Sequence, residues 1–146
     1  RRARVRVVGR NVAILTDAAR RHGVLSLIDV SFTVPRAEAL ALQKAADVLL
    51  MFLWGSGENG IYTTKFFEYV GAERSILAIG PSDSDVGHWI RSADLGRTAK
   101  SAREVAEQLT NWYEQKLSGG MSHVVSSSRY EFARGKQFAE LMPGIL

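Results

Sequence analysis

The sequence predicts an α/β fold in which a parallel β-sheet is covered by helices on both faces. Apolar runs of strand length alternate with segments of helical periodicity along the 146 residues, in the order β-α-β-α-β-α-β-α-β-α. The runs at 47–54 and 75–79 are almost wholly apolar, which is typical of strands buried on both faces. With 46% hydrophobic and 23% charged residues, the composition suits one globular domain with a core of its own.

The first strand and helix are predicted from the start of the chain. Residues 4–9 alternate arginine and valine and then become apolar, which predicts a strand. Asn11 is expected to cap the helix that follows. Gly23 is expected to end that helix, because glycine readily adopts the left-handed conformation found just after helix ends.

A second strand is expected at 24–32 and a second helix at 36–46. Pro35 suits the start of this helix, where its missing N–H has no helical acceptor. The residues of the helix expected to face inward are Leu40, Leu42 and either Ala45 or Ala46.

The second half of the chain continues the alternation without an internal repeat. Gly71 is expected to end one helix, and Asp85 to cap the next. Ser101 and Glu104 have the spacing of a capping box at the start of an amphipathic helix. The expected strands are 47–54, 75–79 and 95–98, and the expected helices are 64–70, 85–92, 101–116 and 128–142.

The net charge is +4, and arginines are concentrated in the first 36 residues. This predicts either a surface for phosphate, nucleic acid or anionic lipid, or a solvated strand edge and helix face. We favour the solvated surface and expect no nucleic-acid partner, because no aromatic residue is interleaved with these arginines. No metal site is expected, since the chain has no cysteine and His22, His88 and His123 lack metal-ligand spacing.

A literal G-x-G-x-x-G pattern is formed by Gly55, Gly57 and Gly60 in the segment LWGSGENGIYTTKFFEYV. In a dinucleotide-binding loop the third glycine lies within the helix, whereas helical pattern here begins three or four residues later. No acidic residue ends the next strand, where the ribose would lie, and no Gly-Lys-Ser/Thr of a phosphate-binding P-loop follows. The pattern is therefore not interpreted as a dinucleotide site.

The helix after this loop is the better candidate for binding an anion. Thr63 and Thr64 can cap it and leave backbone N–H groups at the strand ends, where anions bind readily. Lys65 lies in the first turn, which is unfavourable for the helix dipole unless an anion is nearby. Glu68 is three residues further on, so the alternative is a surface Lys–Glu pair of small energy.

At residues 65–79, KFFEYVGAERSILAI, the chain resembles bacterial glycosyltransferases of the GT-B fold, most of all the retaining family 4 type. The resemblance extends to VRVVGR, to VPRAEALALQKAADVLLMF and to the final segment SRYEFARGKQFAELM. It implies a Rossmann-like domain, residues 1–146, that is the C-terminal, nucleotide-sugar-binding half of such an enzyme.

The resemblance also implies site residues. The glutamate at the position of Glu68 holds the ribose hydroxyls of the donor. The loop before the helix offers backbone N–H groups to the diphosphate and the sugar, and Lys65 is expected to add positive charge. Tyr62 is expected either to stack on a base or sugar or to anchor the loop. The loop residues concerned are Gly60, Ile61, Tyr62, Thr63 and Thr64.

The chain departs from the family pattern in several places. The family has a second glutamate eight residues before Glu68, where this chain has Gly60; the nearest acid, Glu58, reaches the sugar only if the loop bulges. Ser75 replaces a usual proline. The first strand of this half and the N-terminal, acceptor-binding domain are expected to lie outside this sequence, so the fragment alone is expected to be inactive.

The predicted function is therefore donor binding for transfer of a sugar, of the hexosyl type, from a nucleotide diphosphate sugar to a glycan or lipid-linked acceptor in bacterial polysaccharide biosynthesis. No cofactor is expected besides this donor substrate. Two alternatives are a sugar epimerase of the same fold and a non-catalytic α/β nucleotide-binding module. The expected location is the cytoplasm, either free or bound peripherally to the inner face of the membrane.

Overall fold

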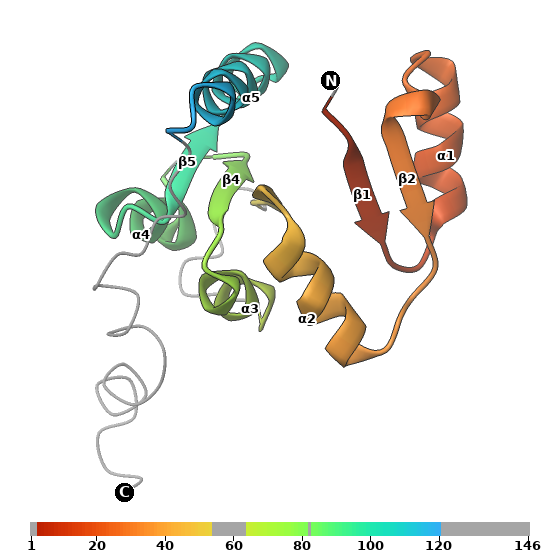
Figure 1. Ribbon diagram of the computed structural model, residues 1–146, viewed down its shortest axis with the longest axis horizontal. Coiled ribbons are helices and arrows are strands. Elements are labelled where there is room, and N and C mark those ends of the chain that lie inside the picture. The colour runs from red at the N-terminus through yellow and green to blue at the C-terminus, as the bar shows by residue number, and fades with distance from the viewer. Residues whose placement is uncertain (1–2, 54–63, 82, 121–146) are drawn as a thin grey trace, which may run out of the picture. The chain divides into compact units, whose positions relative to one another are not determined.

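The computed structural model describes residues 3–53, 64–81 and 83–120 (Figure 1). The chain divides into two compact units, Arg1–Leu42 and Gln43–Leu146, and each is described by itself. None of the described helices is both long and apolar enough to cross a membrane. The prediction that residues 1–146 form a single domain stays a prediction.

The first unit is built around two parallel strands, β1 (Val5–Val8) and β2 (Ile28–Ser31), joined through helix α1 (Val12–Arg21). Val5 pairs with Ile28, and this register places Arg6 opposite Asp29. The two side chains form an ion pair with an Arg6 Nε to Asp29 Oδ2 distance of 3.0 Å. The parallel pair with its crossover helix confirms the β-α-β order that the sequence predicts for this unit.

Helix α1 ends as predicted but does not begin as predicted. Gly23 has φ +67°; its N–H donates to the carbonyl of Arg20 at 3.1 Å, and the N–H of Val24 donates to that of Ala19 at 2.9 Å. These two bonds form a Schellman motif. Asn11 occupies the N-cap position, but its φ is +56° and its side chain makes no capping hydrogen bond, so its predicted capping role is wrong.

The segment after α1 is only partly a strand. Residues 24–27 were expected to be extended, but Leu25–Leu27 form a 3₁₀ turn, η1, and β2 begins at Ile28. The N–H of Leu27 donates to the carbonyl of Val24 at 2.9 Å, and this local bond takes the place of a ladder bond.

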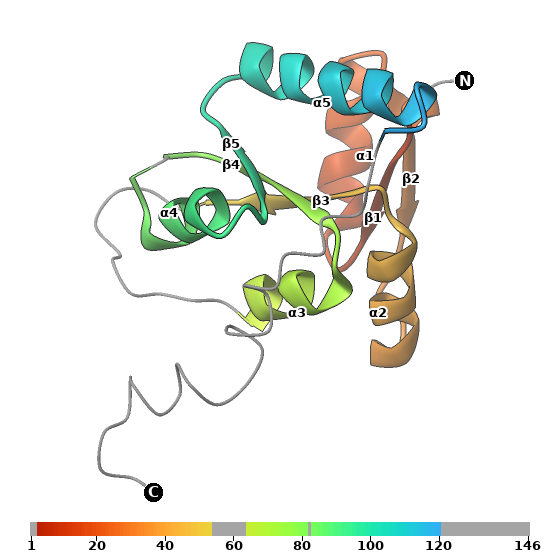
Figure 2. The same cartoon turned by 60° about the vertical axis from the view of Figure 1, so that its left-hand side comes forward.

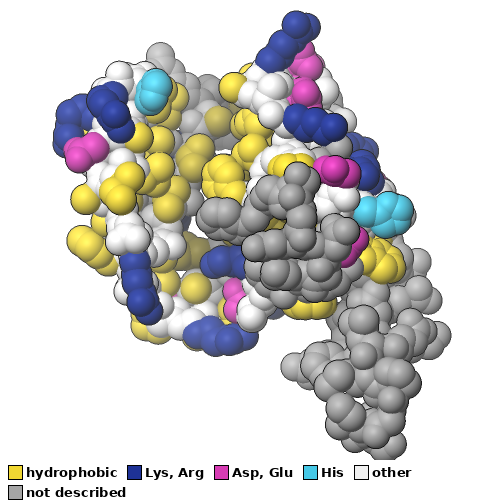
Figure 3. All heavy atoms as spheres, turned by 180° about the vertical axis from the view of Figure 1, so that it is seen from behind, with side chains coloured by type: hydrophobic (Ala, Val, Ile, Leu, Met, Phe, Trp, Pro, Cys, Tyr) yellow, Lys and Arg dark blue, Asp and Glu magenta, His cyan; other side chains and the backbone are white. Residues whose placement is uncertain are grey.

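Arginines of the first unit make local ion pairs. Besides Arg6 with Asp29, Arg20 pairs with Asp17 at 2.7 Å, and all four side chains are more than half exposed. On the face shown in Figure 3, acidic side chains and apolar surface lie next to several of the lysine and arginine side chains. Exposed pairs of this kind contribute about 0–1 kcal/mol each. They agree with a solvated basic surface.

The second unit contains a three-stranded parallel sheet in the order β3-β4-β5, with Leu49 opposite Ile76 and Ile76 opposite Gly96. Helix α2 (Arg36–Ala45) spans the boundary between the units. The elements that follow it are β3 (Val48–Phe52), α3 (Thr64–Ala72), β4 (Ser75–Ile79), α4 (Asp85–Ser92), β5 (Gly96–Ala99) and α5 (Ala102–Leu117).

The central strand β4 is buried on both faces. Ile76 and Ala78 face a core that also contains Phe66 and Val70 of α3 and Ile90 of α4. Leu77, one residue out of phase, faces the other core, with Ala99 of β5 and Trp112 of α5. Figure 2 shows α5 on one side of this sheet and α3 and α4 on the other. Helices on both faces of a parallel sheet, as the sequence predicts, are confirmed for this unit.

Helix α3 is two residues longer than expected. Gly71 lies within it, and the chain leaves the helix at Glu73, which has φ +57° and donates its N–H to the carbonyl of Val70 at 3.1 Å. The prediction that Gly71 ends the helix is therefore wrong. The bounds of β4 and α4 agree with the prediction, and the helix expected at 128–142 lies outside the described residues.

We predict that Gly96→Ala destabilises the second unit by at least about 1–3 kcal/mol. A Cβ at position 96 would overlap the carbonyl oxygen of Ile76 and lie 2.6 Å from its backbone nitrogen. Gly71→Ala is the matched control, because its Cβ would meet no atom within 4 Å. It is expected to stabilise α3 by about 0.5–1 kcal/mol. Urea unfolding followed by circular dichroism measures both, and equal effects of the two substitutions would contradict the prediction.

Candidate functional site

The carboxyl ends of β3, β4 and β5 meet at one edge of the three-stranded sheet, because all three strands are parallel. Each strand is followed along the chain by a helix, and those helices begin at Thr64, Asp85 and Ala102. In open α/β sheets, ligands bind at this edge, where helix N-termini present unpaired backbone N–H groups. The edge is therefore the candidate site of this unit.

The backbones of β3 and β4 approach each other closely at the edge. The N–H of Leu53 donates to the carbonyl of Ile79 at 2.8 Å, and the N–H of Gly80 donates to the carbonyl of Ala99 at 2.9 Å. Gly80 has φ +139°, and a Cβ there would lie 2.6 Å from the carbonyl oxygen of Leu53. Only glycine fits this position. The hydrogen bonding between neighbouring strands therefore continues to the residues just after β3 and β4.

The N-termini of α4 and α5 are occupied by their own side chains. Ser84 Oγ accepts from the N–H of Gly87 at 3.1 Å, so Ser84 and not Asp85 is the N-cap of α4; Asp85 lies in its first turn. At α5, Ser101 Oγ accepts from the N–H of Glu104 at 3.2 Å, as the capping box predicts. In a capping box the Glu104 carboxylate would accept from the N–H of Ser101. Here it accepts instead from the N–H of the preceding residue, Lys100, at 2.9 Å.

The N-terminus of α3 has a different charge. Its first turn contains no acidic residue and carries Lys65. Thr64 and Lys65 are exposed, and Lys65 Nζ lies 6.0 Å from the ring centroid of Tyr69, one turn further on. The positive end of the α3 dipole and the positive charge of Lys65 therefore lie together, and both favour an anion at this end of the helix.

The Glu68 carboxylate lies on α3 and is half-buried. Its Oε2 accepts a hydrogen bond from Gln43 Nε2 of α2 at 3.3 Å. The pKa of the neighbouring Tyr69 is raised, first by burial of its phenol and then by the negative charge of Glu68. Lys65, Glu68 and Tyr69 thus form a group of polar side chains along α3.

Gln43 was not among the residues expected from the sequence. The inward residues of α2 were predicted to be aliphatic, and Leu40 and Leu42 are indeed half-buried. Gln43, however, is the buried residue of the helix, with 9% of its surface exposed. A polar residue next to the apolar stripe of a helix is the signal that could have identified it.

Some of the predicted site residues lie in the described part of the chain and others lie outside it. The structure places Thr64, Lys65 and Glu68 on the first turns of α3, at the candidate edge. His88 of α4 is exposed, with its ring against Trp89 at a centroid distance of 6.2 Å. The predicted residues that lie outside the described part of the chain are Glu58, Gly60, Ile61, Tyr62 and Thr63. Among the described residues, no group of three or more potential metal ligands is present.

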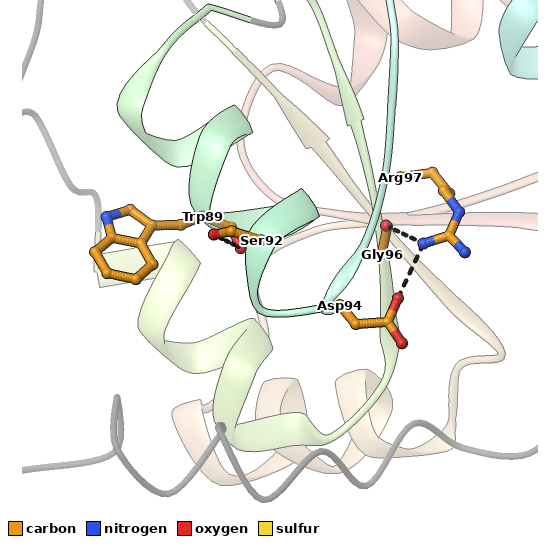
Figure 4. A network of polar contacts seen from close by, with 5 residues as sticks. All are labelled: Trp89, Ser92, Asp94, Gly96 and Arg97. Atoms are coloured by element: carbon orange, nitrogen blue, oxygen red, sulfur yellow. Dashed lines mark hydrogen bonds and ion pairs between the residues drawn. The ribbon is translucent and has the colours of Figure 1, made fainter.

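A separate hollow of about 650 Å³ lies at the opposite edge of the sheet. Ser75 and Gly96 at the amino ends of β4 and β5 line it, together with polar residues of the second half of α5. Arg97 also lines it, and Figure 4 shows that Arg97 Nη1 donates to Asp94 Oδ1 at 3.0 Å and to the carbonyl oxygen of Gly96 at 2.8 Å. In parallel sheets this edge is not the ligand-binding one, so the hollow does not define the site.

Two solved structures are similar to this chain over nearly all of its length. One is WaaG, a glycosyltransferase involved in lipopolysaccharide biosynthesis, with a TM-score of 0.66, 19% identity and 97% of this chain covered. The other is Alr3699/HepE of Anabaena in complex with UDP, with a TM-score of 0.61, 15% identity and 95% of this chain covered. No protein-family model and no curated protein matches the sequence.

The likeness confirms the predicted fold, a Rossmann-like α/β fold of the kind found in GT-B glycosyltransferases. This chain spans only 38% of the WaaG chain and 40% of the HepE chain. At these identities the likeness establishes the fold and leaves the roles of single residues as predictions.

We predict that Tyr69→Phe reduces the loss of stability at alkaline pH. The raised pKa means that the folded protein holds the phenolic proton more tightly than the unfolded chain. The contribution of the protonated phenol to the free energy of unfolding is fully present below the unfolded-state pKa of about 10. It is lost as the pH rises through the folded-state pKa. Urea unfolding between about pH 8 and 11 measures the difference. Tyr113→Phe, an exposed tyrosine on α5, is the control, and identical pH profiles for wild type and Tyr69→Phe would refute the prediction.

Proposed function

We propose that this chain is the nucleotide-sugar-binding part of a glycosyltransferase. The observation that carries the proposal is the likeness of nearly the whole chain to two structures of this fold, one of them a UDP complex. The segment 65–79, in which the sequence resembles the same class of enzyme, begins at the carboxyl edge of the sheet. Fold and motif therefore support the same site.

In this proposal the diphosphate of the donor lies at the N-terminus of α3. The backbone N–H groups of the first turn and the ammonium of Lys65 bind its oxygens, which carry negative charge in the ground state and gain more as the glycosidic bond breaks. The first turn of α3 contains no carboxylate to compete for these groups, whereas α4 and α5 carry Asp85 and Glu104 in theirs.

Glu68 receives the ribose in the same proposal. A carboxylate has two acceptor oxygens, so it can accept hydrogen bonds from two vicinal hydroxyls at once. Glu68 lies one turn along α3 from Lys65, so the ribose and the diphosphate of one nucleotide are near enough to contact both. Thr64 and the predicted loop residues 60–63 complete the contacts to the diphosphate and sugar.

The transfer itself needs a second partner. The bond between the sugar C1 and the diphosphate oxygen breaks, the diphosphate leaves as an anion, and the acceptor hydroxyl forms the new bond to C1 and passes its proton to the departing diphosphate. We propose that the acceptor, a glycan or lipid-linked sugar, is held by a domain outside this sequence. A hexosyl donor, a bacterial cytoplasmic location and a role in polysaccharide biosynthesis belong to the same proposal.

We predict that one nucleoside diphosphate raises the melting temperature of this chain. Ligand at a hundredfold over its dissociation constant adds about 2.7 kcal/mol to the stability, a shift of several degrees for a domain of this size. UDP, GDP, ADP, CMP and NAD are compared by thermal unfolding, with Glu68→Ala as the control. A shift with one nucleoside diphosphate that disappears in Glu68→Ala is expected, whereas a shift with NAD alone would refute donor binding.

We predict further that Lys65→Met weakens binding of UDP by about tenfold or more and leaves binding of uridine unchanged. The reason is that the lysine interacts with phosphate and not with the nucleoside. The salt dependence of UDP binding is also expected to fall, since one charged contact is lost. Titration calorimetry with both ligands at two salt concentrations measures this.

The matched control for Lys65→Met is Lys116→Met. It removes one positive charge from the end of α5, where Lys116 Nζ pairs with Asp47 Oδ1 at 2.6 Å. An exposed pair of this kind contributes at most about 1 kcal/mol to stability. Equal losses of UDP affinity in the two variants would mean that Lys65 acts only through net charge.

A further inference from the structure

We propose that Gln43 is a positioning residue for Glu68: its side-chain amide holds the carboxylate in the orientation that receives the ribose hydroxyls of a nucleoside diphosphate. The inference rests on the proposed function and adds a residue that lies 25 positions away in the sequence. Gln43 itself is not expected to touch the ligand.

The burial of Gln43 is the first observation. It lies in the last turn of α2 and only 9% of its surface is exposed. Burying an amide is unfavourable unless its hydrogen bonds are replaced. An aliphatic residue at this position would avoid that cost. A buried glutamine is therefore expected to have a hydrogen-bond partner.

The partner is Glu68, whose Oε2 accepts from Gln43 Nε2 at 3.3 Å. The other end of the amide, Gln43 Oε1, is buried and has no hydrogen-bond partner among the described residues. The amide cannot turn over, because turning would place its oxygen against the carboxylate and lose the bond that it makes. The carboxylate therefore determines the orientation of the amide, and the buried amide restrains the carboxylate.

A second bond fixes the place of Gln43 relative to α3. Arg74 Nε, just beyond the end of α3, donates to the backbone carbonyl of Lys44 at 2.6 Å. The last turn of α2 is thus joined to α3 at two points. The Gln43 side chain bonds to Glu68 in the middle of α3, and the Lys44 carbonyl bonds to Arg74, two residues after α3 ends. The backbone that carries Gln43 is therefore held in place relative to α3.

Orientation matters for the ligand because two vicinal hydroxyls can donate to both carboxylate oxygens only when the carboxylate is turned towards them. A glutamate side chain that is free to rotate has to be immobilised on binding, which lowers the affinity by about two- to tenfold. We propose that Gln43 already restricts the Glu68 side chain before the ligand binds. Its loss is expected to weaken binding without changing which base or sugar is preferred.

The test uses two substitutions of Gln43 with opposite chemistry. Gln43→Met keeps the length of the side chain and removes both polar atoms, including the unpartnered Oε1. UDP, GDP and ADP are titrated separately by calorimetry. Affinity for the nucleotide that binds is expected to fall about fivefold in Gln43→Met, while the urea midpoint is not lower than that of wild type. A merely structural glutamine would lower the urea midpoint instead.

Gln43→Glu adds a pH readout. Two adjacent carboxyl groups retain one shared proton at low pH, which restores a donor and an acceptor, and repel each other when both ionise. The affinity of the variant relative to wild type is expected to be near one at about pH 5.5 and reduced by about tenfold at about pH 8. The other charged or titratable side chains on the two helices are Arg36, Glu38 and Lys44 of α2 and Lys65 and Tyr69 of α3.

The control for the pH readout is Gln115→Glu, the same change on an exposed position of α5, which is expected to behave as wild type at both pH values. If Glu68→Ala abolishes binding while both Gln43 variants bind like wild type, the positioning role is wrong and the proposed function stands. If Gln43→Met loses affinity and urea midpoint together, the role is structural and the inference is overturned. If wild type binds none of the three nucleotides, the inference falls together with the proposed function.

Discussion

The requirement that β4 be covered on both faces sets the arrangement of the second unit. Ile76 and Ala78 on one face and Leu77 on the other are completely buried, so neither face can be left to solvent. Phe66 and Ile90 cover the first face, and Trp112 covers the second. Each covering helix begins beyond the carboxyl end of the strand before it, and so the same hydrophobic requirement brings three helix N-termini to one edge.

Once the three N-termini are at this edge, charge distinguishes them. Ser84 and Ser101 satisfy backbone N–H groups of α4 and α5, and each of those helices has an acidic residue in its first turn. Helix α3 has Lys65 there instead. The helix whose buried residues complete the larger core is therefore also the one whose exposed end favours an anion.

The fold was largely predictable because it rests on long-range apolar patterning. The bounds of β4 and α4 agree with the sequence prediction, since β4 is an unbroken apolar run and α4 has a short amphipathic pattern ended by a turn. The predictions that failed were local. Asn11 adopts a left-handed conformation rather than capping α1, Ser84 caps α4 in place of Asp85, and Glu73 rather than Gly71 ends α3. These roles depend on the path of the backbone over one or two residues, which apolar patterning does not determine.

The candidate site was only partly predictable, and the two residues that fit their local structure worst are the most informative. Lys65 opposes the dipole of its helix, and Gln43 buries an amide whose oxygen has no partner in the described part of the chain. Natural sequences are locally consistent except where function requires otherwise. Both exceptions meet at α3, Lys65 on its first turn and Gln43 on the carboxylate of Glu68. In the proposed function, an anionic diphosphate would compensate the first, and a diol on an oriented carboxylate would account for the second, so one nucleotide would explain two features that the fold alone does not require.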